Sequence, residues 1–204
     1  VTMEILKNAK KDIKCFSLNP TNAAEKIIKI ARCGKPIIVE RKIDKTLLEL
    51  NKKGYLNGHT PFSAYLAFLS VLAAVIFNKK FIAFSNERSA NEGNVKYLGE
   101  VINHQWSKSF QFEQLFRQYS KKYLAREVEY FSFLRPLYEL QIAKLFSRYP
   151  KYFPSFLSCN EAYKTYSGRK IPTGKWCGNC SKCLFVFSIL FLFVLLIAEH
   201  QGGK

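Results

Sequence analysis

The stretch Phe81-Ile-Ala-Phe-Ser-Asn-Glu-Arg-Ser-Ala-Asn91 decides the fold, because an apolar run ends there abruptly in polar residues. Its first four residues predict a strand. In α/β proteins ligands bind beyond the carboxyl ends of strands, and a simple turn needs no such density of hydrogen-bonding side chains. We therefore expect a nucleotide or substrate to bind to Ser85, Asn86, Glu87, Arg88, Ser89 and Asn91.

The sequence before this stretch has the rhythm of a parallel sheet. Residues 13–18 and 36–41 read as short strands, and each is followed by a helical pattern, at residues 22–32 and 44–52. Strand, helix, strand, helix is the order that parallel strands with crossover helices require. Helix-capping residues stand at the expected helix starts, at Thr21 and Asp44. The predicted class is therefore α/β with a parallel sheet.

Two further segments are predicted to be helical. Residues 62–77 are almost wholly apolar, but a run of this length falls short of the roughly 20 residues that span a bilayer. We expect a helix buried against the sheet. Residues 94–149 have a helical, aromatic pattern, with Pro136 at the start of the last helix. This segment makes the helical C-terminal part of the domain.

A second polar segment, Asn57-Gly58-His59-Thr60, precedes the apolar helix. Glycine allows a ligand to approach the backbone closely, and the following helix offers free N–H groups to an anion. His59 would donate to a phosphate or transfer a proton. The plainer alternative is a loop that caps the helix through Thr60.

The cysteines are the strongest sign of a metal. Cys159 and the turn Cys177-Gly-Asn-Cys180-Ser-Lys-Cys183 supply four thiolates, which fill the tetrahedral shell of a structural zinc ion. An iron–sulfur cluster is the main alternative, and a redox-active dithiol is a weaker one. A four-cysteine knuckle without an open position favours a structural role over catalysis.

The remaining cysteines, Cys15 and Cys33, stand alone in apolar surroundings. The uneven spacing is unlike that of a disulfide-stapled secreted domain, and no signal peptide is expected. We therefore expect a reducing, cytoplasmic environment.

The net charge of +17 indicates polyanionic partners, such as nucleotides, nucleic acid or a sugar phosphate. The alternative is a solvated surface, since the lysines are scattered rather than clustered. The apolar run at residues 184–198 is short for a transmembrane helix, so a buried helix is favoured over a membrane span. A corrupted chain end is a third reading of this run.

Together, Asn57-Gly-His-Thr-Pro-Phe-Ser-Ala64, Ser85-Asn-Glu-Arg-Ser-Ala-Asn91 and Cys177-Gly-Asn-Cys-Ser-Lys-Cys183 resemble the ATP-dependent UDP-N-acetylmuramoyl-L-alanyl-L-glutamate epimerase family. The likeness extends from Val1 to about Phe187. That family resembles the PP-loop, or adenine nucleotide α-hydrolase-like (HUP-like), superfamily, close to the 7-cyano-7-deazaguanine synthases.

The resemblance implies a five-stranded parallel sheet, ATP and Mg²⁺, a UDP-linked muramoyl dipeptide as substrate, and a role in peptidoglycan synthesis. His59 and Glu87 become the candidates for proton transfer, and Arg88 would pair with a carboxylate or phosphate. We expect a PP-loop domain over residues 1–150, a four-cysteine metal-binding segment over 151–187 and an atypical apolar tail over 188–204.

The sequence departs from the superfamily in one respect. The Ser-Gly-Gly-x-Asp-Ser phosphate loop is absent, and Val1-Thr-Met-Glu-Ile-Leu-Lys resembles the helix that follows it. We therefore expect a fragment that lacks its first strand and phosphate loop and is inactive as it stands. There are two alternatives: another PP-loop enzyme that modifies a nucleobase or tRNA, and a non-enzymatic zinc module that binds nucleic acid. The nucleic-acid-binding module ranks last, because the aromatic residues are spread over core-like positions.

Overall fold

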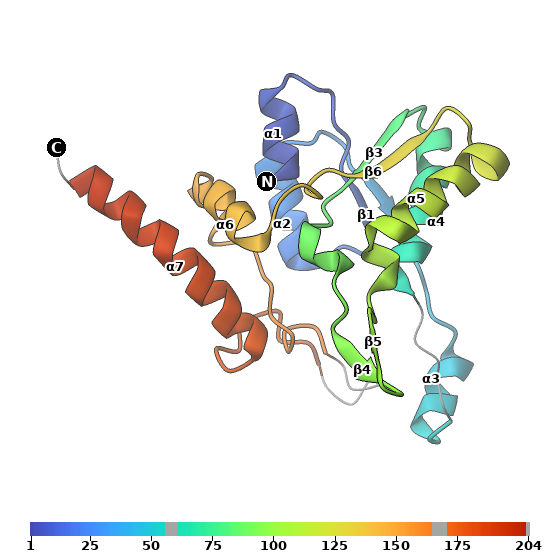
Figure 1. Ribbon diagram of the computed structural model, residues 1–204. Coiled ribbons are helices and arrows are strands. Elements are labelled where there is room, and N and C mark those ends of the chain that lie inside the picture. Colours follow the sequence, from blue (N-terminus) through green and yellow to red (C-terminus); the bar gives the residue numbers. More distant parts are fainter. Residues whose placement is uncertain (56–60, 165–170, 203–204) are drawn as a thin grey trace. The chain divides into compact units, whose positions relative to one another are not determined.

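The computed structural model describes residues 1–55, 61–164 and 171–202, which combine helices with short strands (Figure 1). This composition confirms the expected α/β class in its coarse form. The chain divides into two compact units. The first holds residue 1 with residues 10–58 and 143–204, and the second holds residues 2–9 and 59–142. The expected division at residues 150 and 187 stays a prediction.

The first unit begins with a parallel strand pair. Strands β1 (Phe16–Leu18) and β2 (Ile37–Val39) pair with Phe16 opposite Ile37, and α2 (Asn22–Ala31) connects them. Thr21 caps α2 as expected, since its side chain accepts a hydrogen bond from the Ala24 N–H at 3.3 Å. The helix ends at Arg32, which adopts the left-handed conformation usual for a C-cap.

The next helix, α3 (Lys45–Lys52), also begins at its predicted cap, because Asp44 accepts a hydrogen bond from the Thr46 N–H at 2.8 Å. That bond lowers the pKa of the Asp44 carboxyl. The chain returns to the first unit within α6 (Glu139–Ser147) and continues through η4 (Pro150–Tyr152) to α7 (Ser181–Gly202).

Helix α7 confirms that the apolar run at residues 184–198 is helical, but the expectation that it is buried is wrong for its described side chains. Leu184, Phe187 and Leu192 are each more than half exposed. The described neighbours that line its apolar side, Phe156 and Trp176, leave an open groove along the helix. Among the residues that the structure describes, no helix is long and apolar enough to cross a membrane.

The second unit is built on another parallel pair, β3 (Phe81–Phe84) and β6 (Glu129–Ser132), with Phe84 opposite Ser132 (Figure 1). Its helical elements are α1 (Thr2–Asn8), α4 (Phe62–Ile76), η1 (Arg88–Asn91), η2 (Trp106–Lys108), α5 (Phe110–Tyr119) and the π-helical turn η3 (Ser120–Leu124).

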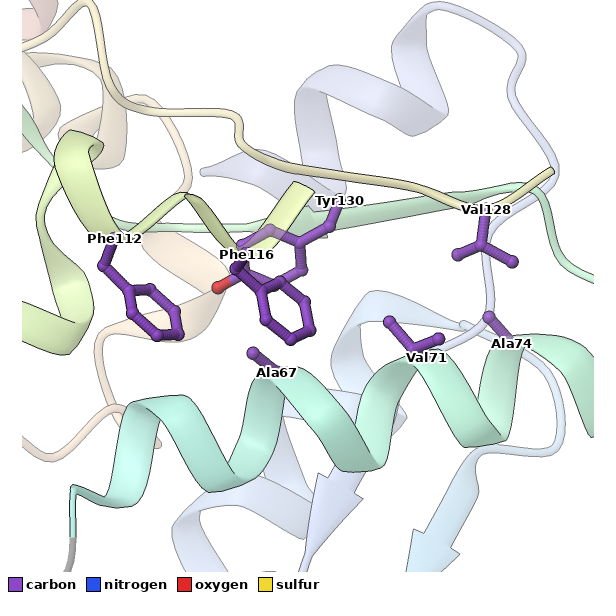
Figure 2. Close-up of a cluster of buried hydrophobic side chains, with 7 residues drawn as sticks. All are labelled: Ala67, Val71, Ala74, Phe112, Phe116, Val128 and Tyr130. Carbon is purple, nitrogen blue, oxygen red and sulfur yellow. The ribbon is translucent and has the colours of Figure 1, made fainter. Parts of the chain in front are cut away.

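The core of this unit lies between α4, α5 and strand β6. Figure 2 shows Phe116 of α5 and Tyr130 of β6 above Ala67 and Val71 of α4. The rings of Phe116 and Tyr130 pack edge to face, with their centres 4.9 Å apart. Each such buried side chain contributes about 1.5–3 kcal/mol to folding. The small residues of α4 let the two aromatic rings approach the helix closely.

Helix α4 forms as predicted, yet it is buried on one face only. Phe62, Leu72 and Ile76 are each 46% exposed or more. The expectation of a helix buried against the sheet is therefore confirmed for one face only, because the described strand β6 and helix α5 cover one side of it.

The expectation that residues 94–149 are helical throughout is also wrong. Strands β4 (Val95–Tyr97) and β5 (Glu100–Ile102) form an antiparallel hairpin, and β6 lies in the same segment. Leu98 and Gly99 both have positive φ, as a two-residue hairpin turn of type I′ requires. The last helix begins at Glu139 rather than at Pro136. The described strands form separate two-stranded sheets, so the five-stranded sheet is not seen in these residues.

Candidate functional site

The polar loop after β3 starts where two parallel strands end. The backbone N–H of Phe133 donates to the Phe84 carbonyl at 2.7 Å, so both strands finish at the same level. The Asn86 side-chain amide donates to the Ser132 hydroxyl across this edge, at 3.0 Å. The loop therefore lies at the carboxyl edge of a parallel pair, which is the usual ligand-binding edge of such sheets.

Arg135 clamps this loop to the start of α5. Its Nη1 donates to the Glu87 carbonyl at 2.8 Å, and its Nη2 donates to the Lys108 carbonyl at 2.8 Å. The same Nη2 lies 3.2 Å from the Glu113 carboxylate, and the side chains of Arg135 and Glu113 are only 13% and 5% exposed. The sequence reasoning missed both residues. Arg135 follows β6 directly, so predicting that strand would have pointed to it.

Two of the six predicted loop residues, Ser89 and Asn91, hold the loop itself. The Asn91 amide donates to the Arg88 carbonyl at 2.8 Å and accepts a hydrogen bond from the Phe110 N–H at 2.6 Å. The Ser89 hydroxyl donates to the Glu139 carboxylate. The Asn103 amide donates to the Ala90 carbonyl at 2.8 Å. These bonds fix the turn of η1 and set the directions of its remaining side chains.

The side chains of three other predicted residues, Ser85, Glu87 and Arg88, do not hold the loop. The Ser85 hydroxyl lies 2.8 Å from that of Thr2, in α1. The Arg88 guanidinium is exposed and lies over the Tyr138 ring, 5.2 Å from its centre. Among the residues that the structure describes, the Glu87 carboxylate has no hydrogen-bond or ion-pair partner. Glu87 and Arg88 are therefore the loop side chains most free to act on a ligand.

A pocket of about 680 Å³ opens beside the loop. It lies between η1, the β4–β5 hairpin, η2 and the start of α5. Its lining residues are Arg88, Asn91, Gly93, Val101, Asn103, Trp106, Ser109, Phe110, Gln111, Gln114 and Arg135. Two arginines, four side-chain amides and an indole thus surround a space large enough for a small molecule.

The predicted residues Asn57, Gly58, His59 and Thr60 lie outside the described residues. The described residues therefore give no distance between His59 and Glu87. That these two side chains transfer protons stays a prediction from the sequence.

The four predicted metal ligands do come together. Their Sγ atoms all lie within 4.8 Å of one another. The Cys159–Cys180, Cys177–Cys183 and Cys180–Cys183 sulfurs are 3.9, 3.8 and 3.5 Å apart. Gly178 has a φ of 70°, which allows the chain to turn between the first two cysteines of the turn. Cys180 and Cys183 lie on either side of Ser181, where α7 begins.

The backbone supports negative charge on these sulfurs. The N–H groups of Asn179 and Cys183 point to the sulfurs of Cys177 and Cys180, each at 3.4 Å. Backbone N–H groups of Asn160 and Cys183 lower the pKa of the Cys180 thiol to about 6. Asn179 acts in the same sense on Cys177, but desolvation and the neighbouring thiols outweigh it and raise its pKa to about 11. Four adjacent thiolates need a cation to ionise together.

Cys15 and Cys33 do not stand alone, as the sequence suggested. They form a disulfide with their Cα atoms 5.7 Å apart, which joins the approach to β1 with the end of α2. Both are buried. This pairing gives no support to the expected reducing environment.

Comparisons with known proteins agree with the motifs. The MurL N-terminal domain family matches residues 1–133, and the MurL C-terminal domain family matches residues 155–199. These two matched regions include the loop after β3 and the four clustered cysteines.

Three similar proteins carry the name UDP-N-acetyl-alpha-D-muramoyl-L-alanyl-L-glutamate epimerase. The protein from Xanthomonas oryzae is 42% identical over 80% of this chain and 36% of its own length. Those from a Micromonospora species and Salinispora tropica are 36% and 37% identical, over 95% of this chain and 42% and 41% of their lengths. The chain thus spans about two-fifths of these relatives.

Proposed function

Because the chain belongs to the MurL family, we propose that it forms part of an ATP-dependent epimerase that inverts the terminal glutamate of UDP-N-acetylmuramoyl-L-alanyl-L-glutamate. The relatives' shared name supports the substrate and the reaction. The parallel strand pairs agree with a HUP-like, PP-loop domain, which we propose as its fold.

The proposed chemistry solves a problem of acidity. A proton on the carbon beside a carboxylate is hard to remove, because its loss creates a second negative charge. Attack of that carboxylate on the α-phosphorus of ATP releases pyrophosphate and leaves an acyl-adenylate, in which the carboxylate has become a neutral acyl group. A base then removes the α-proton, an acid returns one to the opposite face, and water cleaves the adenylate to the carboxylate and AMP.

The position and freedom of Glu87 are the observation that carries this proposal. Its backbone carbonyl is held by Arg135, whereas its carboxylate has no partner among the described residues. It lies at the carboxyl edge of the β3–β6 pair, where a nucleotide enzyme of this class binds its ligands. We propose that Glu87 transfers the α-proton on one face, with His59 as the second group, and that Arg88 pairs with an anionic group of the ligand. A reaction that consumes ATP also implies a cytoplasmic location and Mg²⁺.

We also propose that Cys159, Cys177, Cys180 and Cys183 hold one structural zinc ion. A tetrahedron with Zn–S bonds of about 2.3 Å has sulfurs about 3.8 Å apart. The Cys177–Cys183 and Cys159–Cys180 distances of 3.8 and 3.9 Å fit this value. An iron–sulfur cubane places a different iron beside each thiolate and needs the sulfurs farther apart. The ion would fix the start of α7 against the loop that carries Cys159.

The proposed activity is tested in a chimera in which this chain replaces the matching segment of the Xanthomonas oryzae relative. With ATP and the L-glutamate precursor in D₂O, AMP should form and deuterium should enter the α-position of the glutamate. Glu87→Gln should slow deuterium entry by about 10²-fold or more. Glu92→Gln, an exposed acid just beyond the loop, is the matched control and should leave it unchanged. Deuterium entry at the normal rate in Glu87→Gln would remove Glu87 from the mechanism.

A further inference from the structure

The pocket beside η1 has walls that are fixed before any ligand binds. One wall is the β4–β5 hairpin, which fits closely against Gly93: a Cβ there would lie 2.6 Å from the Val101 side chain. The Asn103 side chain ties the segment after the hairpin to η1. The Phe110 N–H ties the start of α5 to Asn91. Binding to such a preformed pocket costs little ordering of the protein.

The lining is positive and contains no acid. Arg88 and Arg135 both border the pocket, and no aspartate or glutamate is among its described lining residues. The Arg135 guanidinium is occupied by Glu113 and by backbone carbonyls. Arg88 is different, because it is exposed and lies over the Tyr138 ring. A flat guanidinium held on an aromatic ring keeps its N–H groups available for a bidentate contact.

The rest of the lining suits the uncharged part of such a ligand. Trp106 is 43% exposed, and Gln111 fixes it by accepting a hydrogen bond from the indole N–H at 2.9 Å. The indole ring is also held edge to face against Phe112, at 5.4 Å. Gln111 and Gln114 add side-chain amides, which bind peptide or sugar groups. A cation, a fixed aromatic surface and amide donors therefore line one pocket.

We propose that this pocket is a binding site for an anionic end of the muramoyl dipeptide substrate, with Arg88 holding the anion and Trp106 packing against the adjoining uncharged group. In naming the substrate, this inference rests on the proposed function. Two parts of the substrate carry the required charge: the carboxylates of the L-alanyl-L-glutamate end and the diphosphate of the UDP end. Both present oxygens that match a guanidinium in two-point contact.

The test uses the chain itself and its own fluorescence. The sequence has two tryptophans, Trp106 and Trp176. In a Trp176→Phe background the emission comes from Trp106 alone, so a change reports binding within the pocket. L-alanyl-L-glutamate and UDP are titrated separately. The same dipeptide with both carboxylates amidated has no negative charge and is the control.

We expect saturable quenching or enhancement with one of the two anionic probes and none with the amidated dipeptide. A response to the dipeptide assigns the carboxylate end, and a response to UDP assigns the diphosphate end. Arg88→Gln should raise Kd about ten-fold or more, because a charge-assisted bond is lost. Arg88→Lys should restore part of the affinity. Arg126→Gln removes another exposed arginine of the same unit and should leave Kd unchanged.

If the fluorescence of Trp106 changes with neither probe, in a chain that circular dichroism shows to be folded, the inference is overturned. An equal loss of affinity in Arg88→Gln and Arg126→Gln would do the same, since it would indicate a diffuse charge effect. These outcomes are separate from the fate of the proposed reaction. A chimera that forms no AMP, combined with Arg88-dependent binding, would refute the epimerase and leave the pocket assigned.

Discussion

Replacing Arg135 by methionine should destabilise the unit that carries the candidate site, because the arginine joins three separate parts of it. Its guanidinium contacts the carbonyls of Glu87 and Lys108 and the carboxylate of Glu113. Methionine keeps a similar apolar stem and loses all of these bonds. The substitution therefore isolates the polar clamp from the packing of the side chain.

The expected loss is about 4 kcal/mol. The Glu113 side chain is 5% exposed, so it stays desolvated when its partner leaves, and breaking a buried pair in this way costs about 3–5 kcal/mol. The two backbone carbonyls add to the loss unless water reaches them. For a chain of this size, 1 kcal/mol shifts the melting temperature by about 2–4 °C, so Tm should fall by about 8–16 °C.

Thermal unfolding followed by circular dichroism measures this shift. Arg117→Met is the matched control, because Arg117 pairs with Glu129 at 3.6 Å while both side chains remain 41% and 33% exposed. An exposed pair contributes about 1 kcal/mol or less, so the control should shift Tm by less than about 4 °C. Equal shifts in the two variants would refute the reasoning that burial gives the Arg135 clamp its strength.

Three further results are expected. Cys183→Ser should reduce the zinc content from about one ion per chain to almost none by elemental analysis, whereas Ser181→Ala should retain it, and zinc in both would contradict the tetrathiolate site. Gly93→Ala should lower the free energy of unfolding in denaturant by about 1–3 kcal/mol, because the added Cβ would lie 2.6 Å from the Val101 side chain. Adding Val101→Ala should recover much of this loss. A single variant as stable as the original chain would show that the hairpin shifts freely. Ser109→Ala removes the N-cap of α5 and should cost about 1 kcal/mol in the same assay, so a neutral effect would mean that water replaces the cap.

The local features of this fold were predictable from the sequence. Thr21 and Asp44 cap their helices because capping depends on residues two or three positions apart. The strand at Phe81–Phe84 and the polar loop after it follow from an abrupt change in composition. The clustering of Cys177, Cys180 and Cys183 was also predictable, because their spacing places three thiols on one turn.

One missed feature is local: Val95, Val101 and Ile102 are β-branched and Leu98-Gly99 supplies the turn, so the hairpin was predictable. The other missed features depend on distant partners. Strand β6 is short and pairs with a strand far away in the sequence, with Phe81 of β3 opposite Glu129. Without it, the position of Arg135 beside the loop could not be foreseen. Burial of the Arg135–Glu113 pair is a consequence of that pairing.

The most direct test of the central claim is the configuration of the glutamate after reaction in the chimera. Precursor that begins with L-glutamate is incubated with ATP, the product is hydrolysed, and its glutamate is resolved on a chiral column. The account predicts D-glutamate that accumulates together with AMP. Glutamate that remains entirely L while the chimera is folded and ATP is turned over would contradict it.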